Sequence, residues 1–142
     1  MRETALEVFS TMVGVSLTDP GGGNDPPVIS HITGMVGIAG PVSATFTLRC
    51  SRQAAAFIAS QMMGVPAEEA LPMSCDAVGE ICNIVAGYFK AKIGLGEAGM
   101  LSVPTVMAGD NYQVRIRGND ELMEMPLLHG QEAIWIALHV RA

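Results

Sequence analysis

The longest helical pattern in the chain spans residues 75–93 and reads CDAVGEICNIVAGYFKAKI. At about 100° per residue, the large apolar side chains of this segment gather on one side of the helix. They are Val78, Ile81, Val85, Tyr88 and Phe89. This side must bury its apolar surface, so we expect it to pack on a sheet. Ser74 can cap the start of the helix, and the glycines Gly94, Gly96 and Gly99 follow its end.

The opposite side of this helix carries a narrow polar stripe. Asp76, Glu80, Asn83 and Gly87 follow the i, i+3 and i+4 spacing that makes side chains neighbours on a helix. Such a stripe is usually only a solvated helix face. Gly87, however, costs up to about 1 kcal/mol in a helix interior relative to alanine, and it leaves a bare backbone that another protein can approach. A carboxylate can pair with a lysine, while a carboxamide can hold a water molecule in line for attack.

Helix and strand patterns follow a definite order along the rest of the chain. We expect a helix over residues 2–17, strands over 28–39 and 42–50 about a turn at Gly40-Pro41, a helix capped by Ser51 and ended by Gly64, a loop over 66–72, and, after residues 75–93, strands over 101–108, 112–117, 122–128 and 133–141. Runs of strands joined by short turns pair antiparallel. The order therefore predicts an α+β fold, with long helices packed on a largely antiparallel mixed sheet.

Composition limits the class of protein. A length of 142 residues predicts one domain over residues 1–142. The net charge is −6 and the eight basic residues are scattered, which argues against nucleic acid as a partner. Charged residues make up 15% of the chain and hydrophobic residues 49%, against about 25% charged residues in a typical domain. This balance indicates that part of the surface is covered by another molecule.

Targeting and cysteine patterns point to the cytoplasm. No stretch approaches the roughly 18 apolar residues of a spanning helix, and the opening sequence MRETALE lacks the features of a signal peptide. We therefore expect a cytoplasmic protein without membrane insertion. Cys50, Cys75 and Cys82 form no paired motif, and we expect them to be reduced and mostly buried.

Two further patterns give little support for a dinucleotide site or a metal site. Gly94-x-Gly96-x-x-Gly99 has the spacing of a dinucleotide fingerprint, but it follows a helix and precedes a strand, the reverse of what that site needs. The three histidines, His31, His129 and His139, have no partners at metal-ligand spacing, so we expect ordinary hydrogen-bonded histidines and no metal site.

Residues 3–14 and 76–87 echo each other at a shift of 73 positions. The shift places Glu7 over Glu80 and Ser10 over Asn83. This echo has two possible explanations, chance or the duplication of a unit made of a helix followed by strands.

The pattern D-x-x-x-E-x-x-N at residues 76–83 is followed by IVAG at residues 84–87 and by LSVPTV at residues 101–106. EVFSTMVG at residues 7–14 and GMVGIAG at residues 34–40 precede it. Together, in this order, these segments resemble the CheX branch of the CheC/CheX/FliY phosphatases of bacterial chemotaxis. The similarity covers essentially the whole chain and implies a pseudo-two-fold, CheC-like fold.

The resemblance also implies a function. In that family the helix docks on a phosphorylated CheY-like response regulator, and the enzyme is a hydrolase, a protein-aspartyl-phosphate phosphatase of two-component signalling. By position, Asn83 matches the residue that orients water against the aspartyl phosphate, and Glu80 matches the residue that pairs with the receiver's lysine. Asp76 and Gly87 would shape the docking face. The alternative is a non-catalytic receiver-binding or flagellar-switch adaptor that uses the same helix.

The same resemblance sets expectations for cofactors and partners. Mg²⁺ belongs on the partner receiver domain, and no cofactor is expected on this chain. Ser10 stands where a second active helix would carry asparagine, so the first half-site is expected to be inactive. Tyr88 stands where the family commonly has asparagine, and its angle on the helix places it toward the core. A homodimer formed through a sheet edge is expected, and a CheD-like protein is a candidate modulator.

Overall fold

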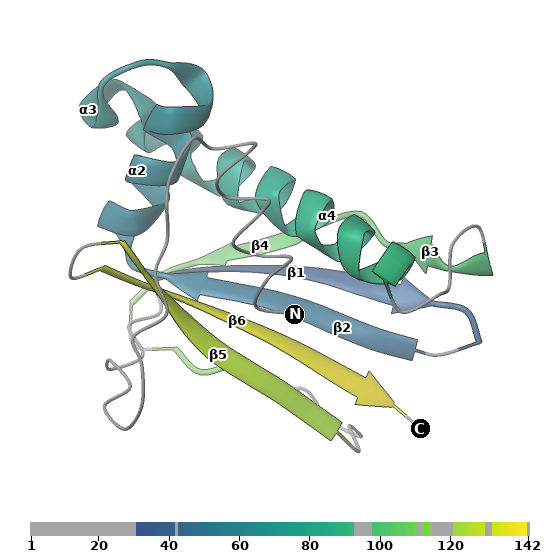
Figure 1. The fold of residues 1–142 in the computed structure, drawn as a ribbon. Coiled ribbons are helices and arrows are strands. Elements are labelled where there is room, and N and C mark those ends of the chain that lie inside the picture. The colour runs from purple at the N-terminus through teal and green to yellow at the C-terminus, as the bar shows by residue number, and fades with distance from the viewer. Residues whose placement is uncertain are drawn as a thin grey trace.

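The computed structural model describes residues 31–41, 43–92, 98–110, 112–114, 121–129 and 132–141. In chain order its elements are β1 (Ile32–Ala39), β2 (Ser43–Cys50), α2 (Arg52–Met63), α3 (Ala67–Ala70), the 3-10 helix η2 (Leu71–Met73), α4 (Ser74–Lys92), β3 (Met100–Leu101), β4 (Thr105–Ala108), β5 (Glu121–His129) and β6 (Glu132–Arg141). Within these residues the sheet runs β3-β1-β2-β6-β5, with β4 also paired to β1. Figure 1 shows α2 and α4 on the same side of this sheet.

The strand pairings confirm the α+β fold class. Every pairing between described strands is antiparallel, and the long helix α4 packs on the sheet (Figure 1). The predicted helix over residues 2–17, with Glu7 and Ser10, lies outside the described residues, and so does its proposed two-fold relation to α4. No helix among the residues that the structure describes is long and apolar enough to cross a membrane.

The central hairpin forms as its alternating sequence predicts. Strands β1 and β2 pair from Ile32 opposite Cys50 to Ile38 opposite Ala44. Successive side chains of a strand point to opposite faces, and in β2 the alternate residues Phe46 and Leu48 are fully buried in the core. At the turn Gly40 has a φ of +154°, and a Cβ there would lie 2.8 Å from the carbonyl oxygen of Ala98. Glycine is therefore required at this turn by both its backbone angle and the close chain.

The caps of α2 are also those that the sequence predicts. The Ser51 hydroxyl accepts a hydrogen bond from the backbone N–H of Ala54 at 3.1 Å, which satisfies one free donor of the first turn. Gly64 ends the helix in a left-handed conformation with a φ of +67°, where glycine has no Cβ penalty.

Residues 66–74 differ from the prediction. The expected loop contains the short helix α3 followed directly by η2 and α4, so Ser74 lies inside a continuous helical path with a φ of −60° and a ψ of −41°. Its hydroxyl donates a hydrogen bond to the carbonyl oxygen of Leu71 at 2.7 Å. The prediction of Ser74 as an N-cap was wrong, because the preceding 3-10 turn already provides the start of α4.

The predicted strand over residues 101–108 is interrupted. Two short strands, β3 and β4, pair with the same neighbour β1 and are separated by residues 102–104. Pro104 has no backbone N–H to donate, which disfavours continuous pairing. Residues 112–114 contain no strand, and the rest of the predicted strand over 112–117 lies outside the described residues. The predicted strands over 122–128 and 133–141 are confirmed as β5 and β6.

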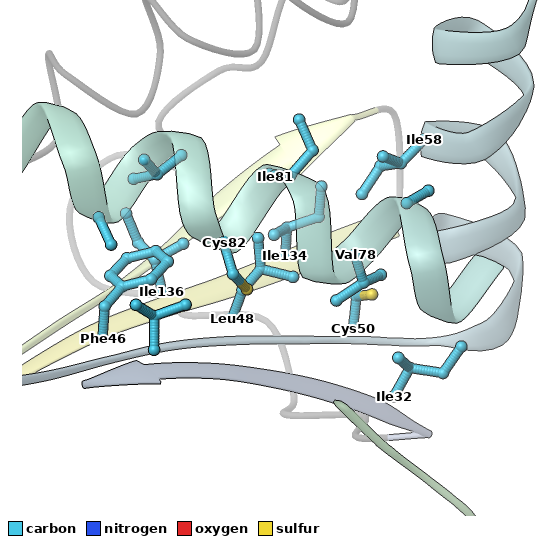
Figure 2. Close-up of a cluster of buried hydrophobic side chains, with 14 of the residues drawn as sticks. Ile32, Phe46, Leu48, Cys50, Ile58, Val78, Ile81, Cys82, Ile134 and Ile136 are labelled. Atoms are coloured by element: carbon cyan, nitrogen blue, oxygen red, sulfur yellow. The ribbon is translucent and has the colours of Figure 1, made fainter. Parts of the chain in front are cut away.

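Helix α4 packs closely on the middle of the sheet. Figure 2 shows Val78, Ile81 and Cys82 of α4 among the apolar side chains of β2 and β6. Gly34 of β1 faces the helix, and a Cβ there would collide with the Cys82 sulfur and lie 3.0 Å from Val78 Cγ1. Glycine at this position lets helix and strand approach. Farther along, the Phe46 and Phe89 rings meet edge to face, with their centroids 5.4 Å apart.

Candidate functional site

The outer side of α4 carries the polar stripe that the sequence predicts. Asp76 and Glu80 are exposed, and Asn83 and Gly87 are half-buried, while Val78, Ile81 and Val85 on the inner side are fully buried. The inner residues fix the rotation of the helix about its axis. The stripe therefore faces away from the core as a consequence of the apolar packing beneath it.

The functional groups of this stripe are free to meet a partner. Among the residues that the structure describes, the carboxylates of Asp76 and Glu80 and the carboxamide of Asn83 make no side-chain hydrogen bond or ion pair. Glu80 and Asn83 are three residues apart, which places their Cβ atoms about 5–6 Å from each other on a helix. One carboxylate and one carboxamide thus point together toward the outside.

A chain segment beside α4 completes this surface. One hollow is lined by Cys75, Asp76, Gly79, Glu80, Pro104 and Val106. A second hollow farther along the helix is lined by Asn83, Ile84, Gly87, Tyr88, Ala91 and Leu101. Glu80 therefore shares its hollow with Pro104, and Asn83 shares its hollow with Leu101. Residues 101–106 form the outer wall of both hollows.

Gly79 of α4 allows this wall to lie close to the helix. A Cβ on Gly79 would lie 3.2 Å from Val106 Cγ2 and 3.6 Å from Pro104 Cβ. A Cβ on Gly87 would lie 3.8 Å from Leu101 Cδ1, which is ordinary van der Waals contact. The Lys90 ammonium donates a hydrogen bond to the carbonyl oxygen of Gly99 at 3.1 Å and ties the end of the helix to the start of the wall.

Tyr88 corrects the sequence-based expectation. It was placed toward the core, but its side chain is 44% exposed and lines the hollow that contains Asn83. Its position lies at the edge of the apolar arc, where the amphipathic ring can cover apolar surface and keep its hydroxyl in water. Tyr88, Leu101 and Pro104 are thus site-lining residues that sequence reasoning missed. Two of them lie in the LSVPTV segment, which was interpreted as a strand and as part of the family resemblance, but not as a wall of the site.

The other polar side chains do not join this site. The Nδ1 of His31 accepts a hydrogen bond from the backbone N–H of Arg52 at 3.3 Å, and the Arg52 guanidinium lies 2.7 Å from an Asp110 oxygen. The Arg52 hydrogen bond and charge lower the pKa of the Asp110 carboxyl. On β6, burial lowers the pKa of His139. No cluster of three or more potential ligands for a metal ion occurs within the described ranges.

The three cysteines form no disulfide, in agreement with the prediction. Cys50 and Cys82 are buried and Cys75 is half-buried, all unbridged. Burial raises the pKa of the Cys82 thiol well above its ordinary value. Cys82 is consequently a protonated packing residue beneath the stripe.

Comparisons with known proteins agree with this geometry. The family model described as chemotaxis phosphatase CheX matches residues 32–128. Chemotaxis protein CheX from Vibrio vulnificus is 21% identical, with 99% of this chain and 93% of that chain covered and a TM-score of 0.80. A CheC-like superfamily protein from Shewanella sp. PV-4 is also 21% identical, with 99% and 94% covered and a TM-score of 0.82.

A third similar structure contains a partner protein. It is the CheX-CheY-BeF3-Mg complex from Borrelia burgdorferi, which is 22% identical, with 99% of this chain and 95% of that chain covered and a TM-score of 0.80. No curated protein matches the sequence.

The sheet, the long helix on it and these likenesses define the class of the protein as a CheC-like α+β fold. The family model covers more than half of the chain, and the chain belongs to the CheX chemotaxis phosphatase family. The predicted family and the predicted enzyme class, a phosphatase, are both confirmed.

Proposed function

We propose that this chain hydrolyses the aspartyl phosphate of a CheY-like response regulator, with Asn83 positioning the water and Glu80 pairing with the receiver's lysine. The observation that carries the proposal is the free carboxylate and carboxamide, side by side on the outward face of α4. Membership of the CheX family supplies the reaction class, and a CheX relative occurs in a complex with CheY, BeF3 and Mg.

The chemistry fits what two such side chains can do. An aspartyl phosphate is an acyl phosphate with a good leaving group, so orienting the attacking water removes much of the barrier. The Asn83 carboxamide can accept a hydrogen bond from this water and donate another to a phosphoryl oxygen. The Glu80 carboxylate can hold a lysine by a charge-assisted hydrogen bond. Magnesium bound to the receiver neutralises the phosphoryl oxygens, so this chain need not hold a metal.

The remaining stripe residues support docking. Asp76 is exposed one turn before Glu80 and adds a second negative charge to the same hollow. Gly87 leaves the helix surface low beside Asn83. A receiver surface with a lysine beside its phosphorylated aspartate therefore meets carboxylates at one end of the stripe and an open, largely apolar hollow at the other.

The alternative function uses the same surface without chemistry. A receiver-binding or flagellar-switch adaptor would need the docking helix but would leave the decay of the phosphorylated receiver unchanged. The Asn83 carboxamide, which lines an otherwise largely apolar hollow, favours the enzyme, because docking alone gives no reason for a water-orienting group there.

The experiment follows phosphate loss from a phosphorylated receiver with Mg²⁺ present. We expect Asn83→Ala to lower turnover by about 100-fold or more while binding is largely kept. Glu80→Ala is expected to weaken both turnover and binding, because the pairing with lysine contributes to both. Gln61→Ala, an exposed polar residue on α2, is the matched control and should behave as the wild type.

Two results would contradict the proposal. Binding of the phosphorylated receiver by the wild-type chain with no change in its decay would leave the adaptor as the function. Normal turnover by both Asn83→Ala and Glu80→Ala would show that the site has been placed on the wrong residues.

A further inference from the structure

The segment between β3 and β4 presents an unusual apolar side chain. Val103 is 83% exposed, the highest value among the exposed large apolar residues in the described part of the chain. Both of its flanking strands are paired with β1, so Val103 stands on an anchored segment of the sheet edge. A single exposed apolar side chain is ordinary on a protein surface, so its meaning depends on what lies beside it.

Ser102 fixes the segment that carries Val103. Its backbone N–H donates to the carbonyl oxygen of Gly37 at 2.9 Å, and its hydroxyl accepts from the backbone N–H of Gly37 at 2.8 Å. The same hydroxyl lies 3.2 Å from the carbonyl oxygen of Val103, to which it donates. Ser102 thereby satisfies both backbone groups of Gly37 and holds the next residue outward.

Val103 stands between the two hollows of the site. Its neighbour Pro104 lines the hollow of Glu80, and Leu101, two residues before it, lines the hollow of Asn83. A molecule that covers Glu80 and Asn83 together must therefore lie beside Val103. The adjoining hollow is rich in apolar surface, from Ile84, Ala91 and Leu101, and so suits an apolar patch on that molecule.

We propose that Val103 is a specificity-determining docking residue, held in place by Ser102, and that it packs on an apolar patch beside the phosphorylated aspartate of the receiver. The proposal rests on the proposed function for the identity of the partner. Its basis is the position of the exposed Val103 between Leu101, which lines the hollow of Asn83, and Pro104, which lines the hollow of Glu80. Acidic groups beside Pro104 and apolar groups beside Leu101 match a receiver that offers a lysine next to apolar side chains.

Binding to a CheY-like receiver loaded with BeF3 and Mg²⁺ tests the proposal without any turnover. We expect Val103→Ala to raise the Kd about tenfold, through the loss of two buried methyl groups, and Val103→Asp to raise it further by placing a charge in the contact. With the phosphorylated receiver, KM should rise by the same factor while kcat stays unchanged. Met63→Ala is the matched control, since Met63 is 47% exposed and lies at the end of α2, outside the segment 101–106 that borders the hollows.

Ser102 gives a second test of the same contact. Ser102→Ala removes the acceptor of the Gly37 N–H and should raise KM with kcat kept, and Ser102→Thr should restore the wild-type KM because it retains the hydroxyl. If Ser102→Ala instead disturbs the whole fold, its Tm and kcat should fall together. A change confined to KM, reversed in Ser102→Thr, therefore indicates loss of the docking contact.

Three outcomes separate this proposal from the proposed function. If Val103→Asp and the wild type bind the BeF3-loaded receiver equally, the docking role of Val103 is wrong even if phosphate is released. If Val103→Asp separates two copies of this chain and leaves receiver affinity unchanged, Val103 contacts a second copy and the proposal is overturned. If Val103→Asp weakens binding but the wild type does not hydrolyse the phosphate, the docking role stands and the phosphatase proposal fails.

Discussion

In the proposed mechanism Asn83 and Glu80 would have different chemical tasks, although they occupy neighbouring positions on one helix face. A carboxamide both donates and accepts hydrogen bonds, whereas an ionised carboxylate only accepts them. The first can therefore hold a water molecule against a phosphoryl group, and the second can hold a cation. Among the described residues, neither side chain makes a hydrogen bond or ion pair that docking would have to break.

Cys82 lies on the buried side of α4, and its thiol should make the protein less stable at alkaline pH. Burial, with a smaller contribution from Cys50, raises the pKa of its thiol above the ordinary value of 9.0. The folded state holds the proton more tightly than the unfolded state, so the stabilisation is complete below pH 9 and is lost as the pH rises above it. We expect the free energy of unfolding to fall by up to about 1.4 kcal/mol per pH unit there.

Denaturant unfolding between pH 8 and 11 measures this loss. Cys82→Ala removes the thiol and should show a smaller slope above pH 9, besides a lower stability at every pH from the cavity that it leaves. An unchanged slope in Cys82→Ala would assign the alkaline loss to other groups. Cys75→Ala is the matched control, because that thiol is only half-buried.

Among the elements, α4 connects the core to the site. Its inner residues lock it onto β1 and β2 (Figure 2), and the same rotation turns Glu80 and Asn83 outward. The wall formed by residues 101–106 follows α4 in the chain, and it is held beside the helix because β3 and β4 pair with β1. The site is thus a helix face bordered by a strand edge, and both are positioned by the same central hairpin.

Gly87→Ala separates helix stability from docking. A Cβ there meets only Leu101 Cδ1 at 3.8 Å, so alanine fits, and its higher helix propensity should stabilise the fold by about 0.5–1 kcal/mol. If Gly87 keeps the helix surface low for the receiver, the Kd for the BeF3-loaded receiver should rise in this more stable variant. Thermal unfolding and binding titration measure the two effects, and a variant that is both more stable and equally tight would remove Gly87 from the docking face.

At the scale of the whole molecule, the sheet has two ends. Strand β5 lies at one end, and the short strands β3 and β4 lie at the other (Figure 1). Edge strands present unpaired backbone groups that a second copy can use. The wall beside Glu80 and Asn83 occupies the β3 and β4 end, so a second copy that pairs through β5 would leave the proposed receiver site open.

We therefore predict a homodimer that pairs through β5. Sedimentation at micromolar concentration should give twice the mass of 14.9 kDa, and addition of the receiver should increase the mass further. A monomeric profile would contradict the prediction. A dimer that dissociates when the receiver binds would instead place the dimer contact at the β3 and β4 end.

Three other expectations from the sequence stay predictions. They are the single domain over residues 1–142, the cytoplasmic location and a CheD-like modulator.

The sequence predicted the parts of the molecule that depend on local spacing. Apolar residues at helical intervals defined the inner face of α4 and thus the outward direction of Glu80 and Asn83. Ser51 and Gly64 marked the ends of α2, and the alternation of Phe46 and Leu48 with polar residues marked the buried face of β2. These features are determined by the geometry of the helix and strand themselves.

Only the tertiary structure decided what lies beside the stripe. Leu101 and Pro104 line hollows beside α4 because β3 and β4 each pair with β1, which lies more than sixty residues earlier in the chain. The role of Ser74 likewise depended on the preceding 3-10 turn. No local periodicity encodes such long-range pairing, so the helix with the polar stripe could be predicted from the sequence and the wall of residues 101–106 beside it could not.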